Sequence, residues 1–481
     1  MAGAVKAAVA FFLTTSLGRV SILLGILFSS GACVRCLLNL VPRSVLAALF
    51  LVALVYVGAE YIAIWRRNRV KCFMGTGNDL QHVYGCMPSA RDPPRPPLWC
   101  FGGYTQFVPW LVYNMLVAIL APLPFESEEI EVKGLLKKTQ PESEANPRSM
   151  VDKVVVHYFP AVSSTSGPRS LPLDAPALFI DPGLTCTAQD VPGSSLMRRA
   201  HLMGIRVVVI ERRGHHGRLG APRFNIFGDS DDSEQIYNVV AGRLKGALFF
   251  WVGLSSGSKL VIEGLGKFDK RRAEGDASAP RIAAAACICP GYNLETCFKP
   301  FQWPFSKICL ASAKDVFVAR NEEVLRRHDP QAFDRVVRSP CLQTMLAAAA
   351  PFAGFESSQD YFAHENPVLF VQQVTTPTLV LNVQDDPMTV VANAFAKSPF
   401  HKGEPTFVDL LERSPCGMLL ISSTGSHCPF LDGYLWPFER VPLWLGGVML
   451  NCWAERCALE FFQGYAAQTR SQQPAGRGPA L

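Results

Sequence analysis

Short apolar segments that alternate with helical ones in the middle of the chain constrain its fold most strongly. Buried strands are predicted at 177–180, 205–210 and 247–252, and helices at 195–203 and 233–244. Apolar strands that alternate with helices form a mostly parallel sheet with helices on both faces. The sequence therefore predicts a doubly wound α/β fold.

A Gly-x-Ser-x-Gly pattern, Gly253-Leu-Ser255-Ser-Gly257, lies between the third strand and the next helix. This is the context of a nucleophile elbow, where the turn is too tight for flanking side chains and holds the serine exposed at the sheet edge. The pattern alone occurs by chance with a probability of roughly 0.2 in a chain of this length. Its position after a buried strand favours a nucleophilic Ser255.

A serine needs a base to take its proton, and an imidazole base needs a carboxylate to fix its tautomer. Asp386 and His427 each follow a later apolar strand, at 378–381 and 417–422. Such positions at the carboxyl ends of strands are where doubly wound folds carry their active sites. Taken singly, the acid is typical of a turn and the histidine of a surface loop. Together with Ser255 they predict a catalytic triad.

The oxyanion formed by such a serine needs two backbone N–H donors. We expect one from Ser256, next to the nucleophile, and one from Leu184, in the loop after the strand at 177–180. Gly183 permits close backbone approach there. The alternative is an ordinary Pro-Gly turn.

A second histidine-containing loop, Arg212-Arg213-Gly-His-His216-Gly, raises the question of a metal. We expect no metal site, because no carboxylate or third histidine has ligand spacing near it, and a glycine-bounded loop explains it. The 15 cysteines are scattered and odd in number, which favours reduced thiols. The acidic run at 228–232 predicts a helix N-cap with acids in the first turn.

The N-terminal region is expected to anchor the chain in a membrane. The whole chain is 49% hydrophobic and only 18% charged, and soluble domains are nearer a quarter charged. Val45–Trp65 is long enough to span the ~30 Å hydrocarbon core of a bilayer. Basic residues at 66–71 follow it, as on a cytoplasmic flank. The segment at 7–30 is a possible earlier span, and 107–123 is expected to be an interfacial helix.

The chain is therefore divided into four parts. Residues 1–70 form the anchor region, 71–150 an extension and linker, 151–465 the α/β domain, and 466–481 a disordered tail. Within the α/β domain, 292–362 interrupts the alternation and is predicted to form a helical cap, and 267–280 a polar surface insertion. The net charge of +6 is modest, and no basic block is interleaved with aromatics, so nucleic-acid binding is not expected.

From about Trp99 to Gly433 the sequence resembles the YheT-like branch of the α/β-hydrolases, which includes membrane-anchored abhydrolase-domain esterases and lipases. The matching segments are Gly103–Gln106, Pro182–Thr185, Arg213–Gly217 with Pro222-Arg223 and Gly228-Asp229, Asn382–Pro387, and Gly425–Gly433. The resemblance assigns nucleophile, acid and base to Ser255, Asp386 and His427. Tyr104-Thr105 replaces the His-Leu of the family.

The resemblance implies hydrolysis of lipid esters or thioesters without a cofactor. We expect a membrane-anchored serine hydrolase of the endoplasmic reticulum or another endomembrane, with its catalytic domain in the cytosol. A lipid acyltransferase that uses the same triad is the first alternative. The second is a non-catalytic membrane scaffold with a hydrolase fold, and no protein partner is predicted.

Overall fold

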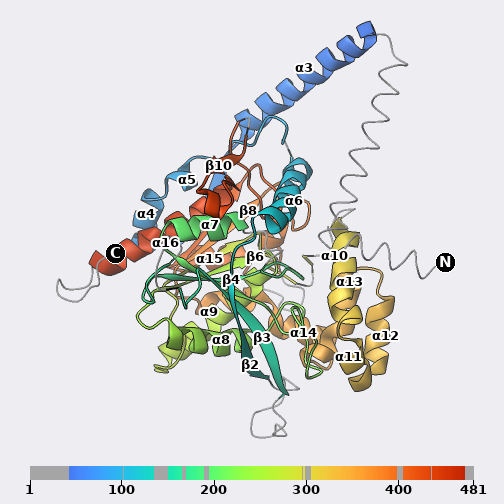
Figure 1. The fold of residues 1–481 in the computed structure, drawn as a ribbon, viewed down its shortest axis with the longest axis vertical. Helices are drawn as coiled ribbons and strands as arrows, with labels where there is room; N and C mark the ends of the chain where they lie inside the picture. Colours follow the sequence, from blue (N-terminus) through green and yellow to red (C-terminus); the bar gives the residue numbers. More distant parts are fainter. Residues whose placement is uncertain are drawn as a thin grey trace.

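The computed structural model describes residues 43–100, 102–134, 150–164, 170–188, 194–294, 296–297, 305–397, 405–434 and 436–471. Their main feature is a nine-stranded sheet of order β1-β9-β8-β7-β6-β4-β5-β3-β2 (Figure 1). The strands are β1 (Val70–Met74), β2 (Glu126–Gly134), β3 (Met150–Phe159), β4 (Ala177–Asp181), β5 (Arg206–Ile210), β6 (Phe249–Leu254), β7 (Ala284–Ile288), β8 (Thr378–Val383) and β9 (Gly417–Ser422).

Strands β4 to β9 are parallel to one another, whereas β1 and the β2–β3 hairpin join antiparallel at the two edges. All residues of these six parallel strands are buried. Continuous apolar strands are typical of a parallel sheet that is covered on both faces. The doubly wound fold predicted from the alternation is confirmed.

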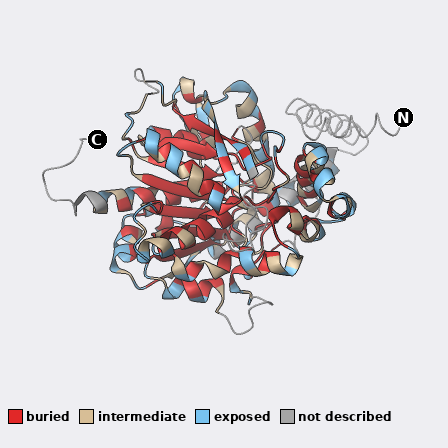
Figure 2. Cartoon of the chain, turned by 90° about the horizontal axis from the view of Figure 1, so that it is seen from below, coloured by how far each residue is buried: buried red, intermediate tan, exposed pale blue. Residues whose placement is uncertain are grey.

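Two layers of helices cover the sheet, and the buried strands lie between them (Figure 2). One face packs against α4 (Asn78–Gly85), α5 (Pro88–Arg91), α7 (Ser194–Leu202) and α16 (Trp453–Ser471). The other packs against α8 (Ser230–Arg243), α9 (Gly257–Ala273) and α15 (Phe407–Arg413). A two-stranded sheet of β10 (Phe438–Arg440) and β11 (Val448–Leu450) lies outside the main one.

Five α-helices of the described residues lie between β7 and β8, mostly within the segment 292–362 that was predicted to form a cap (Figure 1). We refer to them as the cap helices, or the cap. They are α10 (Phe305–Lys314), α11 (Glu322–His328), α12 (Pro330–Arg338), α13 (Leu342–Ala349) and α14 (Ser358–Glu365). These helices share a hydrophobic core of their own, which also includes Phe224 and Phe227 from the loop after β5. The cap is therefore joined to the α/β domain by apolar packing as well as by the chain.

Two apolar helices precede the sheet hairpin. The predicted span 45–65 lies within α3 (Arg43–Arg67), which projects away from the domain (Figure 1). The predicted interfacial segment 107–123 lies mostly in α6 (Gly103–Leu120). Among the helices whose residues are all fully described, α6 is the one long and apolar enough to cross a membrane. The possible span 7–30 lies outside the described residues.

Two sequence-based expectations differ from the structure. The segment 267–280 is not wholly an insertion, because α9 continues through it to Ala273. Lys267 forms an ion pair with Glu263 one turn earlier, which stabilises the polar end of the helix. Residues 466–471 of the predicted tail belong to α16, and 472–481 lie outside the described residues.

Candidate active site

Ser255 lies in the turn between β6 and α9 with φ at +53°, in the left-handed region. The two glycines around it are required by packing. A Cβ at Gly253 would lie 2.4 Å from Ser258 Cα, and one at Gly257 would lie 2.2 Å from the Asp181 carbonyl oxygen. The turn thus has the tight geometry of a nucleophile elbow and excludes flanking side chains.

The structure brings the three predicted triad residues into one chain of hydrogen bonds. Ser255 Oγ lies 2.6 Å from His427 Nε2, and His427 Nδ1 lies 2.8 Å from Asp386 Oδ2. The other oxygen of Asp386, Oδ1, accepts the backbone N–H groups of Met388 at 2.7 Å and Thr389 at 2.9 Å. The carboxylate is therefore held in one orientation, with Oδ2 toward the imidazole.

The charge of Asp386 changes the acidity of His427. Burial favours the neutral ring, but the Asp386 carboxylate, the neighbouring Cys428 and the hydrogen bond to Asp386 outweigh it and raise the pKa of His427 to about 9. The same interactions stabilise the imidazolium that forms when the ring takes a proton from a serine. Asp385, beside it, is half-buried, and burial raises its pKa to about 7.

The predicted oxyanion loop runs beside the nucleophile. A Cβ at Gly183 would lie 3.7 Å from Ser255 Cβ, so the backbone that leads to Leu184 passes close to the serine. Arg212 holds this loop, because its guanidinium donates to the carbonyl oxygens of Pro182 and Gly183, the latter at 3.3 Å. It also donates to Ser256 Oγ at 3.3 Å. Sequence reasoning missed Arg212, whose only local signal is its position just after a strand.

The loop that carries His427 is fixed by a buried glutamine that the sequence did not single out as a contact. Gln106 of α6 is fully buried. Its Nε2 donates to Thr424 Oγ1 at 3.3 Å, and its Oε1 accepts the Leu431 N–H at 3.0 Å. The two bonds join α6 to the loop on both sides of His427.

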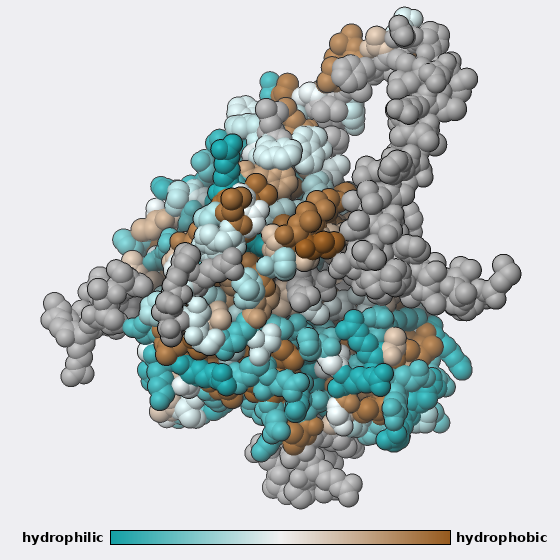
Figure 3. Space-filling model, in the orientation of Figure 1, coloured by the Kyte–Doolittle hydropathy of each residue, from teal (hydrophilic) through white to brown (hydrophobic). Residues whose placement is uncertain are grey.

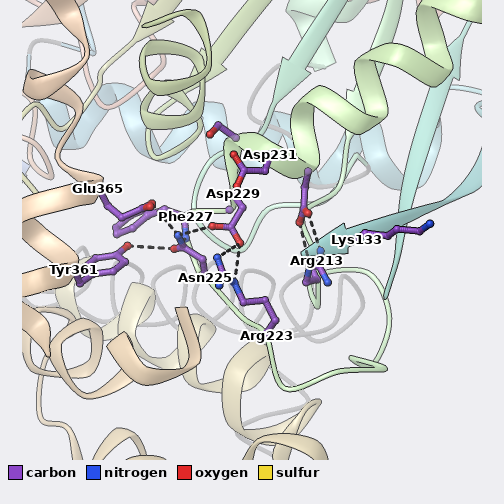
Figure 4. A network of polar contacts seen from close by, with 12 residues as sticks. Lys133, Arg213, Arg223, Asn225, Phe227, Asp229, Asp231, Tyr361 and Glu365 are labelled. Atoms are coloured by element: carbon purple, nitrogen blue, oxygen red, sulfur yellow. Dashed lines mark hydrogen bonds and ion pairs between the residues drawn. The ribbon is translucent and has the colours of Figure 1, made fainter. Parts of the chain in front are cut away.

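The loop after β5 contains a buried polar network that reaches the cap (Figure 4). Arg213 binds both carboxylate oxygens of Asp232, at 3.0 and 2.7 Å. Asp229 accepts from Arg223 at 3.1 Å, and Asn225 connects Asp229 to the cap helix α14. Asp229 occupies the predicted N-cap position of α8 but makes no capping bond, because its carboxylate is committed to this network.

A small apolar pocket lies between the oxyanion loop and the cap. Its walls come from Leu184 and from apolar side chains of the loop after β5 and of the cap. These are Ile226, Phe227, Phe317, Leu342, Met345, Leu346 and Ala349. The expected oxyanion residue Leu184 thus also borders this apolar pocket.

One premise of the expectation of no metal site was wrong, because a carboxylate, Glu211, and a further histidine, His157, lie near His216. Glu211 lies within hydrogen-bonding distance of both His157 and His216. A second group with metal-ligand spacing, Cys289 with Asp386 and His427, shares its donors with the triad. Cysteines of the described ranges are free thiols.

No protein-family model matches the chain. Human protein ABHD15 is 28% identical over 264 residues, which cover 54% of this chain and 50% of ABHD15. Mouse phospholipase ABHD3 is 26% identical over 280 residues, which cover 54% of this chain and 60% of ABHD3. The matches therefore extend over about half of the length of these curated relatives.

Among solved structures, the peroxisomal α/β-hydrolase Lpx1 of Saccharomyces cerevisiae aligns with 14% identity and a TM-score of 0.37, over 74% of this chain and 93% of Lpx1. A likeness at this level carries no argument about activity. The strand order and the strand-to-helix turn at Ser255 accompany sequence similarity to ABHD15 and ABHD3 over 54% of the chain. On these grounds the chain belongs to the α/β-hydrolase superfamily.

Proposed function

We propose that the protein is a serine hydrolase that cleaves carboxylic esters of lipids through an acyl-serine intermediate. The observation that carries this proposal is the hydrogen-bonded chain from Ser255 through His427 to Asp386. A serine aligned with a base, itself oriented by a carboxylate, is the arrangement that nucleophilic acyl transfer requires.

In the proposed reaction, His427 Nε2 takes the proton of the Ser255 hydroxyl as Oγ attacks the ester carbonyl. The backbone N–H groups of Leu184 and Ser256 stabilise the resulting oxyanion. His427 then gives the proton to the leaving alcohol, and the acyl-serine remains. Water, deprotonated by His427, releases the acid and restores Ser255.

A lipid substrate is supported by the apolar pocket beside Leu184. An acyl chain that follows this apolar lining would extend from the oxyanion loop toward the cap, and the pocket would have to widen to hold it. Mouse and human ABHD3 carry the name phospholipase, which is consistent with the same class of substrate. Within the α/β-hydrolases we further propose that the protein belongs to the YheT-like branch, because its sequence contains the matching motif segments described above.

Fluorophosphonate labelling of the serine tests this function. We expect Ser255→Ala to abolish labelling and esterase turnover while the protein still folds, and the exposed Ser278→Ala to retain both. Undiminished labelling of Ser255→Ala would remove Ser255 as the nucleophile. Absence of labelling in the wild type would favour a non-catalytic scaffold. Transfer of the acyl group to an added alcohol, faster than to water, would favour an acyltransferase.

We also propose that α3 anchors the protein in an endomembrane, with the hydrolase domain in the cytosol. Its apolar length and the basic flank at 66–71 support this. Helix α6 is an unsuitable span despite its composition, since Gln106 is bonded to the His427 loop and would have to leave it. Apolar side chains gathered over α6 suit the membrane surface instead (Figure 3).

Protease treatment of intact microsomes tests this orientation. A C-terminal tag should be digested without detergent, because the proposed domain faces the cytosol. Survival of the tag until detergent is added would place the domain in the lumen. The wild type should sediment with membranes, and a form without residues 1–67 should remain in the supernatant.

A further inference from the structure

Two histidines and a glutamate, none of them part of the triad, converge beside Arg212. His157 lies in β3, Glu211 directly follows β5, and His216 lies in the loop beyond. His157 Nε2 is 2.8 Å from Glu211 Oε1, and His216 Nδ1 is 2.9 Å from Glu211 Oε2. One ligand atom of each residue lies within 4.8 Å of those of the other two. We propose that these residues bind a divalent transition-metal ion of the zinc type.

The distances suit a small tetrahedral ion. Zinc bonds to imidazole nitrogen and carboxylate oxygen are ~2.0–2.2 Å long, which sets neighbouring ligand atoms ~3.3 Å apart. The two nitrogen-to-oxygen distances are 2.8 and 2.9 Å. The two nitrogens face different oxygens of Glu211, so a carboxylate that binds through both oxygens would need each pair to separate by only ~0.5 Å to admit the ion. Two imidazoles and one carboxylate favour zinc or a neighbouring transition metal over calcium or magnesium, which prefer oxygen ligands.

Further contacts orient two of the ligands. Ser127 Oγ lies 2.7 Å from His157 Nδ1, on the far side of the ring from Glu211. A hydroxyl that accepts the Nδ1 proton leaves Nε2 as a lone-pair donor toward a metal, which is the usual outer support of a ligating histidine. The Ala188 N–H donates to Glu211 Oε1 at 3.1 Å and holds the carboxylate in place.

Proton positions account for both states of the group. In the tautomers whose N–H groups face Glu211, each ring donates to that carboxylate, and the Ser127 hydroxyl donates to His157 Nδ1. With metal, each ring carries its proton on the opposite nitrogen instead, so that His157 donates to Ser127 and His216 Nε2–H points to solvent.

The proposed metal site is buried on one side and open to solvent on the other. The side chains of His157 and Glu211 are 9% and 2% exposed, whereas that of His216 is 52% exposed. An ion can thus enter from solvent past His216 and be held by the two buried ligands. Three protein ligands leave a fourth position for water.

Titration of the full-length, detergent-solubilised protein with Co²⁺, followed by Zn²⁺ displacement, tests the proposal. We expect one Co²⁺ per chain, with visible absorption bands and no thiolate charge-transfer band. His216→Ala should weaken binding at least tenfold and Ser127→Ala about tenfold. His82→Ala, at another exposed histidine, should leave it unchanged.

Thermal unfolding gives a second measurement that does not depend on the visible bands. Zn²⁺ should raise the Tm of the wild type and of His82→Ala, but not that of His216→Ala, because a ligand that binds only the folded state stabilises it. Equal affinity of the wild type and His216→Ala would overturn the proposal. A cobalt spectrum dominated by thiolate charge transfer would do so as well, since it would assign the ion to cysteines.

Discussion

Replacement of Asp386 by asparagine should stop the proposed catalysis, because the new amide selects the wrong tautomer of the His427 imidazole. Oδ1 accepts two backbone N–H groups, from Met388 and Thr389, so the amide oxygen of the new side chain must take that position. The amide NH₂ then faces His427 Nδ1 and forces it to accept. The proton moves to Nε2, where it points at Ser255 Oγ, and the ring cannot take the proton of the serine.

The expected loss is large. A carboxylate-to-amide change that leaves the geometry intact but selects the wrong tautomer lowers kcat ~10⁴-fold in a serine protease, or ~5.5 kcal/mol at ~1.36 kcal/mol per tenfold. We expect a similar loss for Asp386→Asn in hydrolysis of a short-chain aryl ester, with an unchanged Tm.

Asp385→Asn is the matched control. Asp385 is adjacent in sequence and half-buried, and burial raises its pKa to about 7, so an amide is a close substitute for its neutral form. Its turnover should fall less than tenfold. The reasoning would be refuted if Asp385→Asn were the more damaging change, or if Asp386→Asn kept more than a tenth of the wild-type rate.

Two further predictions concern the nucleophile turn and the base. Gly257→Ala would put a Cβ 2.2 Å from the Asp181 carbonyl oxygen, so it should destabilise the protein by ~3 kcal/mol or more in denaturant unfolding. Gly217→Ala meets no atom within 4 Å and should change stability by less than ~0.5 kcal/mol; equal losses would contradict the packing argument. Because the pKa of His427 is raised and the neutral ring is the base, kcat/KM should rise with pH through a midpoint above the ordinary imidazole value of 6.5. A profile already level at that pH would contradict this shift.

The fold was predictable because its signals are local. Each parallel strand is a short apolar run that ends near a polar loop. The glycines on both sides of Ser255 predict the tight turn, because larger residues would not fit there. The predicted strand at 417–422 coincides with β9. Asp386 and His427 could be chosen because the carboxyl ends of parallel strands meet at one edge, which turns a position along the chain into a position in space.

Other parts of the site depend on contacts that no local pattern records. Gln106 reaches residues more than 300 positions away, and the partners of Arg212 are backbone carbonyls, which carry no side-chain signature. Glu211 lies five residues before His216, but His157 is 54 positions from Glu211 along the chain, so the group forms only when β3 and β5 pair. The end of α9 was misread because polar residues on an exposed helix resemble those of a loop.

Strand β1 determines how much freedom the hydrolase domain has relative to α3. Only Asn68 and Arg69 separate the helix from β1, and two extended residues reach at most ~7 Å. Arg69 is itself bonded to Ser423, just after β9. If α3 is held in a bilayer, the connection between it and the sheet is therefore short and rigid, and does not behave as a flexible linker. Ser255 would keep a fixed height above the lipid headgroups. Its access to a lipid would depend on how far that lipid rises from the bilayer, and not on diffusion of a tethered domain.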